Sequence, residues 1–190
     1  MASITDNLYL GIENCYARLP TFDDAKAIVT YFKANREFLT PWEPTRPDSF
    51  FTLKDWQQRL FQLAKLQQHG LAFYFLLFAN EPDEVVGIIS FSHISYYPAF
   101  TANVGYSLAK HAQSRGIMRK ALQATCQLLF NELNLHRITA AYMPRNLRSA
   151  RLLNAVGFIK EGQAKDYLLI NGKWEDHILT SLTNEHWQKC

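Results

Sequence analysis

Cysteine is scarce in this chain of 190 residues, which has only Cys15, Cys126 and Cys190. The three are odd in number, widely spaced and never in a Cys-x-x-Cys pair, so a disulfide framework and a structural zinc site are both disfavoured. The six histidines show no metal-ligand spacing, and we expect no metal. An obvious nucleophile partner is also missing for His93, His111 and His136, which gives a Ser-His-Asp hydrolase little support.

Long apolar runs are missing too. No stretch approaches the roughly 18 residues that a membrane span requires, so we expect no membrane partner. The N-terminus lacks the basic start of a signal peptide, and Asp6, Asn7 and Glu13 interrupt any apolar stretch there. With 48% hydrophobic and 19% charged residues, the chain is predicted to be cytoplasmic, with one domain over residues 1–190. We expect a monomer or a weak homodimer.

Charge is unevenly distributed along the chain. Residues 1–95 hold 8 Lys/Arg and 11 Asp/Glu, whereas residues 96–190 hold 12 and 6. The basic excess lies between Lys110 and Arg151, where eight basic residues face only Glu132. Such a surplus fits an anionic ligand, either a nucleotide or a nucleic acid, although a solvated basic face would give the same count.

Apolar spacing and turn residues predict alternating strands and helices. Helices are expected over residues 21–36, 52–70, 116–133 and 146–156. Strands are expected within residues 7–18 and over 71–78, 85–94, 102–108, 136–142, 164–170 and 174–182, with turns at Glu81-Pro82-Asp83 and Asn171-Gly172. The segment TPWEPTRP, with three prolines, is predicted to be a loop. The order predicts a mixed α/β fold whose sheet carries helices on both faces.

The segment Gln113-Ser114-Arg115-Gly116-Ile117-Met118 follows a strand and opens a helix. Backbone N–H groups at a helix start lack intrahelical partners, and the helix dipole makes this end positive. Gly116 would let the backbone approach a phosphate closely. Cations are disfavoured at a helix start, yet this one carries Arg115, Arg119 and Lys120. A bound anion would remove that conflict.

The next helix start shows the same conflict. Asn146 is a good N-cap, yet the first turn is surrounded by Arg145, Arg148 and Arg151. Either start alone could be a surface helix with solvated arginines. Together they favour one large polyanion, such as a coenzyme.

Here the sequence resembles the GNAT N-acetyltransferases. The strand–QSRGIM–helix segment resembles their coenzyme A signature, Q/R-x-x-G-x-G/A, and Asn146-x-x-Ser149 followed by Gly157-Phe158 and Glu161-Gly162 resembles their second signature. Met118 departs from the general Gly or Ala, but Met is typical of the Rim-type branch, which acetylates ribosomal protein N-termini. FLTPWEP, NVGYSL, HRITAAYMP and AKDYLLINGKWEDHILTSLT extend the resemblance over nearly the whole chain.

The resemblance implies a three-layer α-β-α sandwich around a mixed sheet of about seven strands. The sheet would be splayed like a V between two central strands, with acetyl-CoA in the split. The strand Asn103–Leu108 would bind the pantetheine arm, and a backbone N–H near Ser107 or Leu108 would polarise the thioester carbonyl, as a preorganised donor can. The coenzyme would also be held by Asn146, by Ser149 and by the amides of Gln113, Ser114, Arg115, Gly116, Ile117, Met118 and Arg119.

In the implied reaction a free amine attacks the thioester directly. An N-terminal α-amine has a reference pKa near 8, against about 10 for lysine, so it needs little help from a base. A base is hard to find in this sequence, because Asn103 stands where many relatives carry Glu. Leu153 likewise stands where many relatives place a tyrosine acid.

Four polar residues remain as candidates for the chemistry. Ser149 could act on the departing sulfur, or it could merely cap its helix. On the amine side the candidates are Tyr106, Tyr142 and Asp166, although each tyrosine could equally be a satisfied core residue.

The loop TPWEPTRP is a candidate wall of the acceptor groove, as the same segment is in relatives. Its three prolines lower the entropy lost on ordering it around a peptide. Glu43 would attract an α-ammonium or a basic ribosomal tail, and Trp42 would supply apolar contact. Alternatively, Trp42 only anchors the loop to the core.

The sequence therefore predicts an enzyme that uses acetyl-CoA as co-substrate and acetylates a ribosomal protein N-terminus. The expected target is the alanine of a small-subunit protein, and contact with the ribosome stays open. One alternative acceptor is a small amine, such as a polyamine or amino sugar. Another alternative is a non-catalytic module on ribosomal RNA. It is weaker, because single-strand RNA readers usually expose aromatic platforms, and the basic segment has only Phe130 and Tyr142, both expected inward.

Overall fold

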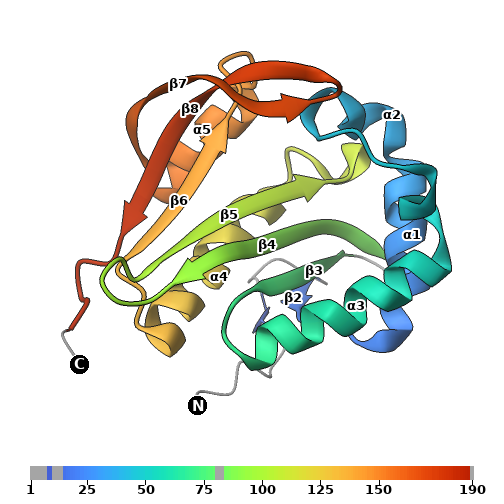
Figure 1. Ribbon diagram of the computed structural model, residues 1–190, viewed down its shortest axis with the longest axis horizontal. Coiled ribbons are helices and arrows are strands. Elements are labelled where there is room, and N and C mark those ends of the chain that lie inside the picture. Colours follow the sequence, from blue (N-terminus) through green and yellow to red (C-terminus); the bar gives the residue numbers. More distant parts are fainter. Residues whose placement is uncertain (1–7, 10–14, 80–83, 189–190) are drawn as a thin grey trace.

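One sheet contains all eight strands that the computed structural model describes, within residues 8–9, 15–79 and 84–188 (Figure 1). Its order is β1-β2-β3-β4-β5-β6-β8-β7. The strands are β1 (Leu8–Tyr9), β2 (Cys15–Arg18), β3 (Phe73–Ala79), β4 (Val85–Ser95), β5 (Thr101–Leu108), β6 (Arg137–Tyr142), β7 (Ile159–Ile170) and β8 (Lys173–Thr183). All neighbouring pairs are antiparallel except β5 and β6, which run parallel. The mixed sheet is confirmed.

Helices cover both faces of this sheet. They are α1 (Ala25–Ala34), α2 (Arg36–Leu39), α3 (Leu53–Gln68), α4 (Ile117–Leu133) and α5 (Leu147–Val156). In Figure 1, α1 and α3 lie in front of the sheet, and α4 and α5 lie behind it. Side chains of β5 confirm this, since Ser107 contacts α1 whereas its neighbour Tyr106 contacts α5, and successive strand residues point to opposite faces. The predicted three-layer sandwich is confirmed.

The sheet opens between β5 and β6. These strands pair only where Thr101–Asn103 lies beside Arg137–Thr139. Beyond that point β5 continues to Leu108 and β6 to Tyr142 without pairing to each other, and the two ribbons diverge in Figure 1. The predicted V-shaped split is therefore present, and it leaves one edge of β5 open.

Local sequence signals account for the helix ends and the last hairpin. The Thr52 hydroxyl accepts a hydrogen bond from the Asp55 amide and caps α3. The Asn171-Gly172 turn joins β7 to β8 with both residues at positive φ, 45° and 77°, as a tight type I′ hairpin requires. The predicted turn at residues 81–83 lies outside the described residues. Residues 7 and 10–14 of the predicted opening strand lie outside them as well.

The proline-rich segment is not the simple loop that we predicted. Helix α2 runs directly into a 3₁₀ turn over Thr40–Trp42, and a second 3₁₀ turn covers Asp48–Phe51. Pro41 stands in the first turn of the former and Pro47 just before the latter, where a missing backbone N–H costs no helical hydrogen bond. Prolines therefore start these turns instead of preventing them.

An aromatic cluster joins α1, the second 3₁₀ turn and α3. The Phe32 ring stacks on Trp56 at 5.4 Å between centroids, and the Phe50 ring lies edge-on to both, at 4.8 and 5.2 Å. All three side chains are buried in the main core. This cluster fixes α3 against the front of the sheet. In the described residues, no helix has the length and apolarity needed to cross a membrane.

Candidate active site

The open edge of β5 presents backbone groups to the split. The Ala109 amide donates to the Val86 carbonyl at 2.7 Å, and Leu108 pairs with Gly87 without exchanging hydrogen bonds. Because amides alternate in direction along a strand, the Ser107 amide points toward β4, whereas the Tyr106 and Leu108 amides point into the split. Of the two residues predicted to polarise a carbonyl, Leu108 therefore has the correctly directed N–H.

Tyr31 of α1 and Asn35, the residue that ends this helix, hold the end of β5 in place, and sequence reasoning missed both. The buried Tyr31 hydroxyl donates to the Ser107 hydroxyl at 2.8 Å. The Asn35 side chain accepts the Lys110 amide at 3.1 Å. Burial raises the pKa of Tyr31, so the phenol stays protonated. The available signal was a pair of polar residues four positions apart at the end of α1, both of them buried.

The start of α4 is built to leave its amides uncovered. Gly116 is its N-cap residue at φ 76°, no side chain caps the helix, and the first helical bond runs from Lys120 N to Gly116 O. Ser114 also has positive φ, 62°. Turns of this kind direct successive N–H groups into one concavity that suits an anion. A Cβ placed on Gly116 would meet no atom within 4 Å, so the space in front of the turn is open.

Side chains of this loop point in different directions. Ile117 and Met118 are buried in the core, so each can offer only its amide to a ligand. That explains why Met is compatible with a position where Gly or Ala is general. Arg119 and Lys120 are exposed, and the Gln113 side chain accepts a hydrogen bond from Arg148 of α5 at 2.8 Å. This last contact links the two helix starts that the sequence singled out.

The start of α5 places a serine beside a tyrosine of β5. The Asn146 side chain accepts the Ser149 amide at 3.1 Å and caps the helix. The Ser149 hydroxyl instead lies 2.7 Å from the Tyr106 hydroxyl. Burial raises the pKa of Tyr106, so this phenol stays protonated at neutral pH and can donate a hydrogen bond. Asn146 therefore has the capping role, and Ser149 is oriented by Tyr106 behind the open edge of β5.

Arg145 has partners outside the coenzyme signature. Its guanidinium donates to Glu175 at 3.1 Å and to the Pro41 carbonyl at 3.3 Å, and it lies 5.2 Å from the centre of the Trp42 ring. The charge conflict at α5 is thus relieved partly by Glu175, without a bound anion.

The loop around Trp42 lies against the β7–β8 turn, where the Asn171 amide donates to the Glu43 carbonyl at 3.1 Å. Trp42 is half-buried and lies outside the main core, so it does not anchor the loop there. Burial raises the pKa of Glu43, an effect that Arg46 opposes from 3.6 Å. Ionising this carboxylate, which lies near Tyr31 of α1, therefore has a cost.

The other two predicted amine-side residues occupy different settings. Tyr142 is half-buried and ends β6, opposite Ile178 of β8. Asp166 is exposed in an irregular part of β7, and its amide donates to Asp176 at 3.0 Å. In the described part of the chain, no hydrogen bond joins Asp166 to Tyr106 or Ser149. Its role in the site stays a prediction.

Comparison with known proteins identifies the class. The acetyltransferase (GNAT) domain model matches residues 16–159, and the chain belongs to this family of N-acetyltransferases. It is 41% identical over 178 residues to the [ribosomal protein uS5]-alanine N-acetyltransferase of Escherichia coli (strain K12), covering 94% of this chain and 92% of that relative.

Two solved structures agree with this. The ribosomal-protein-S5-alanine acetyltransferase of Vibrio fischeri superposes with a TM-score of 0.93 at 47% identity, over 97% of this chain and all of that one. RimJ of Mycobacterium smegmatis, in complex with CoA-disulfide, has a TM-score of 0.84 at 29% identity, over 92% of this chain and 84% of that one. GNAT acetyltransferases use acetyl-CoA, so the predicted coenzyme class is that of the family.

Proposed function

We propose that this enzyme acetylates the N-terminal alanine of ribosomal protein uS5, with acetyl-CoA as co-substrate. The observation that carries the proposal is the likeness, over nearly the whole chain, to relatives named for that reaction. The open edge of β5 and the uncapped start of α4 support it, since both would serve a coenzyme placed in the split.

The chain offers fitting groups for acetyl-CoA. The start of α4 has no side-chain cap, and the space beside Gly116 is open, so the amides of this turn would bind the pyrophosphate. The open edge of β5 would pair with the amides of the pantetheine arm. The Leu108 amide would then donate to the thioester oxygen, where negative charge develops as the amine attacks.

Proton transfer would use the pair on the back of β5. When the carbon–sulfur bond breaks, the thiolate needs a proton, and the Ser149 hydroxyl can donate it while taking one from Tyr106. The tyrosinate left on Tyr106 would then regain its proton from solvent, which receives one from the attacking amine. The attacking α-amine must lose a proton of its own. Solvent can accept it near neutral pH, because the reference pKa of an N-terminal α-ammonium is only near 8.

The acceptor would enter from the front of the sheet, beside Trp42 and Glu43. Glu43 would attract the α-ammonium before it is deprotonated, and Trp42 would bound the space available to the first side chain. A small first residue would fit this arrangement.

A three-substrate comparison tests the proposal. Steady-state acetylation is measured with a peptide beginning with alanine, with the same peptide blocked at its N-terminus and carrying one lysine, and with free spermidine. We expect the alanine peptide to have the highest kcat/KM. Faster turnover of spermidine would favour a small-amine acceptor instead. Trp42→Ala should lower kcat/KM for the alanine peptide, and unchanged kinetics would remove this loop from recognition.

A further inference from the structure

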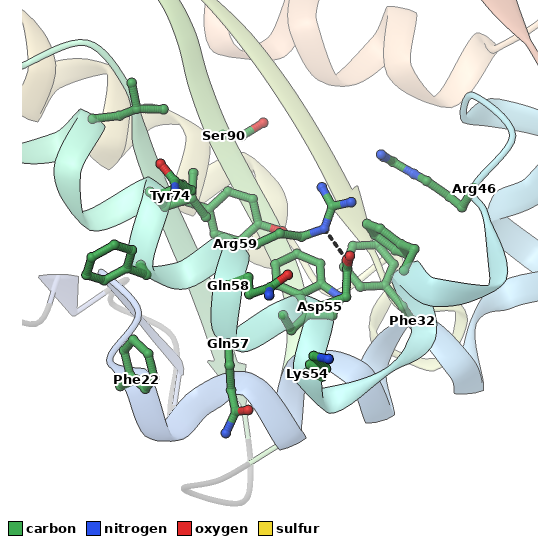
Figure 2. A pocket seen from close by; sticks show the side chains of 16 residues that line it. Phe22, Phe32, Arg46, Lys54, Asp55, Gln57, Gln58, Arg59, Tyr74 and Ser90 are labelled. Atoms are coloured by element: carbon green, nitrogen blue, oxygen red, sulfur yellow. Dashed lines mark hydrogen bonds and ion pairs between the residues drawn. The ribbon is translucent and has the colours of Figure 1, made fainter.

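A hollow in front of the sheet lies between α3 and the middle strands (Figure 2). Its floor includes Tyr74 of β3 and Ser90 of β4, which are paired across the sheet. The Ser90 hydroxyl donates to the Gly105 carbonyl of β5 at 3.4 Å. Ser90, one of the lining residues, is thus bonded to the residue that precedes Tyr106 in β5.

Unused hydrogen-bond donors line this hollow. Trp56 is only 3% exposed, and its indole Nε1 has no partner in the described residues. The Nε–H group of Arg46 likewise donates no hydrogen bond to a described residue, and the Glu43 carboxylate lies 3.6 Å from it as an ion-pair partner. Buried polar groups are normally hydrogen-bonded. The Trp56 indole, which lacks any acceptor, and Arg46 Nε, which has only a long ion pair with Glu43, therefore suggest that an acceptor group is supplied from outside.

Two arginines also converge here. The guanidinium groups of Arg46 and Arg59 lie over the same Phe50 ring, 4.6 and 5.1 Å from its centre. Figure 2 shows them pointing toward one another across the hollow. Asp55 binds Arg59 through Nε, and no acceptor is found among the described residues for the terminal nitrogens of either arginine. Each arginine already pairs with one carboxylate through Nε, Glu43 for Arg46 and Asp55 for Arg59. The terminal nitrogens of both guanidiniums remain available to bind an anion between them.

We propose that the hollow is a subsite for the acceptor chain, and that it selects an aspartate or glutamate shortly after the N-terminal residue. The inference rests on the proposed function, because it extends the acceptor from its amine along the front of the sheet. A carboxylate suits the place, since its two oxygens can accept hydrogen bonds from both guanidiniums. The aromatic wall of Phe50 and Trp56 would exclude water and strengthen those bonds.

The test uses peptides that all begin with alanine. One glutamate is moved through the second to fifth positions, and each peptide has matched versions with glutamine and with lysine at that place. We expect kcat/KM with full-length enzyme and acetyl-CoA to be about tenfold higher for glutamate than for glutamine at one position. Lysine at that position should be worse than glutamine.

Matched variants locate the selectivity. Arg59→Gln should reduce the glutamate preference severalfold and leave acetylation of the glutamine peptide nearly unchanged. Arg46→Gln should reduce the preference similarly, but it also removes the partner of Glu43, so for this variant only the ratio between the glutamate and glutamine peptides is compared. Lys54→Gln removes the same charge from the same helix as Arg59. Lys54 also borders the hollow, but it is exposed and lies away from the two guanidiniums (Figure 2). This control should retain the preference. Thermal unfolding of each variant shows whether it is folded.

The outcomes separate the two proposals. Equal kcat/KM for the glutamate, glutamine and lysine peptides at every position would overturn the subsite while leaving alanine acetylation intact. A preference that survives in both arginine variants would overturn this placement too. If the enzyme binds acetyl-CoA but acetylates none of the alanine peptides, the proposed function itself is wrong.

Discussion

The starts of α4 and α5 look alike in the sequence and differ in the structure. Both are rich in arginine, which a helix N-terminus normally disfavours. At α5 the Asn146 side chain caps the helix, and Arg145 is bound by Glu175. At α4 no side chain caps the helix, and the turn at Gly116 faces open space.

The difference shows what marks an anion site. Excess positive charge at a helix start is ambiguous, because nearby carboxylates can neutralise it, as Glu175 does. Uncovered amides combined with residues at positive φ are more specific, since they direct donors into open space where an anion can bind them. We therefore expect α4 to bind the pyrophosphate, and α5 to supply the chemistry through Ser149.

The largest effect should come from the pair behind β5. Ser149→Ala and Tyr106→Phe should each lower kcat about a hundredfold, as loss of general acid catalysis does, with acetyl-CoA affinity nearly retained. Single-turnover assays and calorimetric titration measure the two quantities. Asn146→Ala is the contrasting variant: it should cost about 1 kcal/mol of stability through the lost cap. Parent-like kcat in a folded Ser149→Ala enzyme would leave the serine without a chemical role.

Gly116→Val should weaken acetyl-CoA binding at least about tenfold, because a β-branched side chain would occupy the open space before the amides. Gly172→Val is a matched control, since Gly172 has φ 77° and equally open surroundings but lies in the β7–β8 turn. Both variants carry the same backbone strain. Equal coenzyme affinity for the two, measured by calorimetry, would remove the phosphate assignment from α4.

Glu43 offers a test on the acceptor side. Burial raises the pKa of Glu43, so ionising it opposes folding as pH rises through the range between its unfolded pKa, near 4, and its higher folded pKa. Glu43→Gln should therefore match or exceed the stability of the parent above that range, and any gain should disappear in more acidic solution. Its kcat/KM for an alanine peptide should fall roughly fivefold, a change of about 1 kcal/mol. Thermal unfolding against pH and peptide kinetics measure both, and a variant that is less stable but fully active would contradict this role.

The smallest effect should separate the arginines of α5. Arg148→Ala should weaken acetyl-CoA binding about threefold at low salt and less at high salt, because Arg148 contacts Gln113 at the start of α4 and is exposed to screening. Arg145→Ala should leave coenzyme affinity unchanged, since its partners are Glu175 and Pro41. Titrations at two salt concentrations compare them. An equal loss of acetyl-CoA affinity in both variants would mean that the arginines contribute through their general positive charge and not through individual contacts.

Much of the fold follows from local patterns. Periodicity and capping residues predicted the long helices and strands, and the turn at Gly116 was predicted as a ligand-binding helix start. The prolines of TPWEPTRP misled because proline both breaks helices and begins them. That choice depends on what the flanking residues can pack against.

The site itself depends on contacts between distant residues, which one sequence does not reveal. Tyr106 and Ser149 are 43 positions apart, and Tyr31 and Ser107 are 76 apart. The meeting of Arg46 and Arg59 over Phe50 likewise requires the second 3₁₀ turn to pack on α3. The sequence could suggest single candidate residues, but which of them contact one another is decided by tertiary packing.

The most direct test is the intact mass of ribosomal protein uS5 from cells of the source organism that lack this enzyme. We predict that uS5 from those cells is lighter than normal by one acetyl group, with the loss located at its N-terminal alanine by fragmentation. Returning the parent gene should restore the mass, and returning Ser149→Ala should restore it slowly or not at all. An unchanged, fully acetylated uS5 in cells without the enzyme would contradict the proposed function.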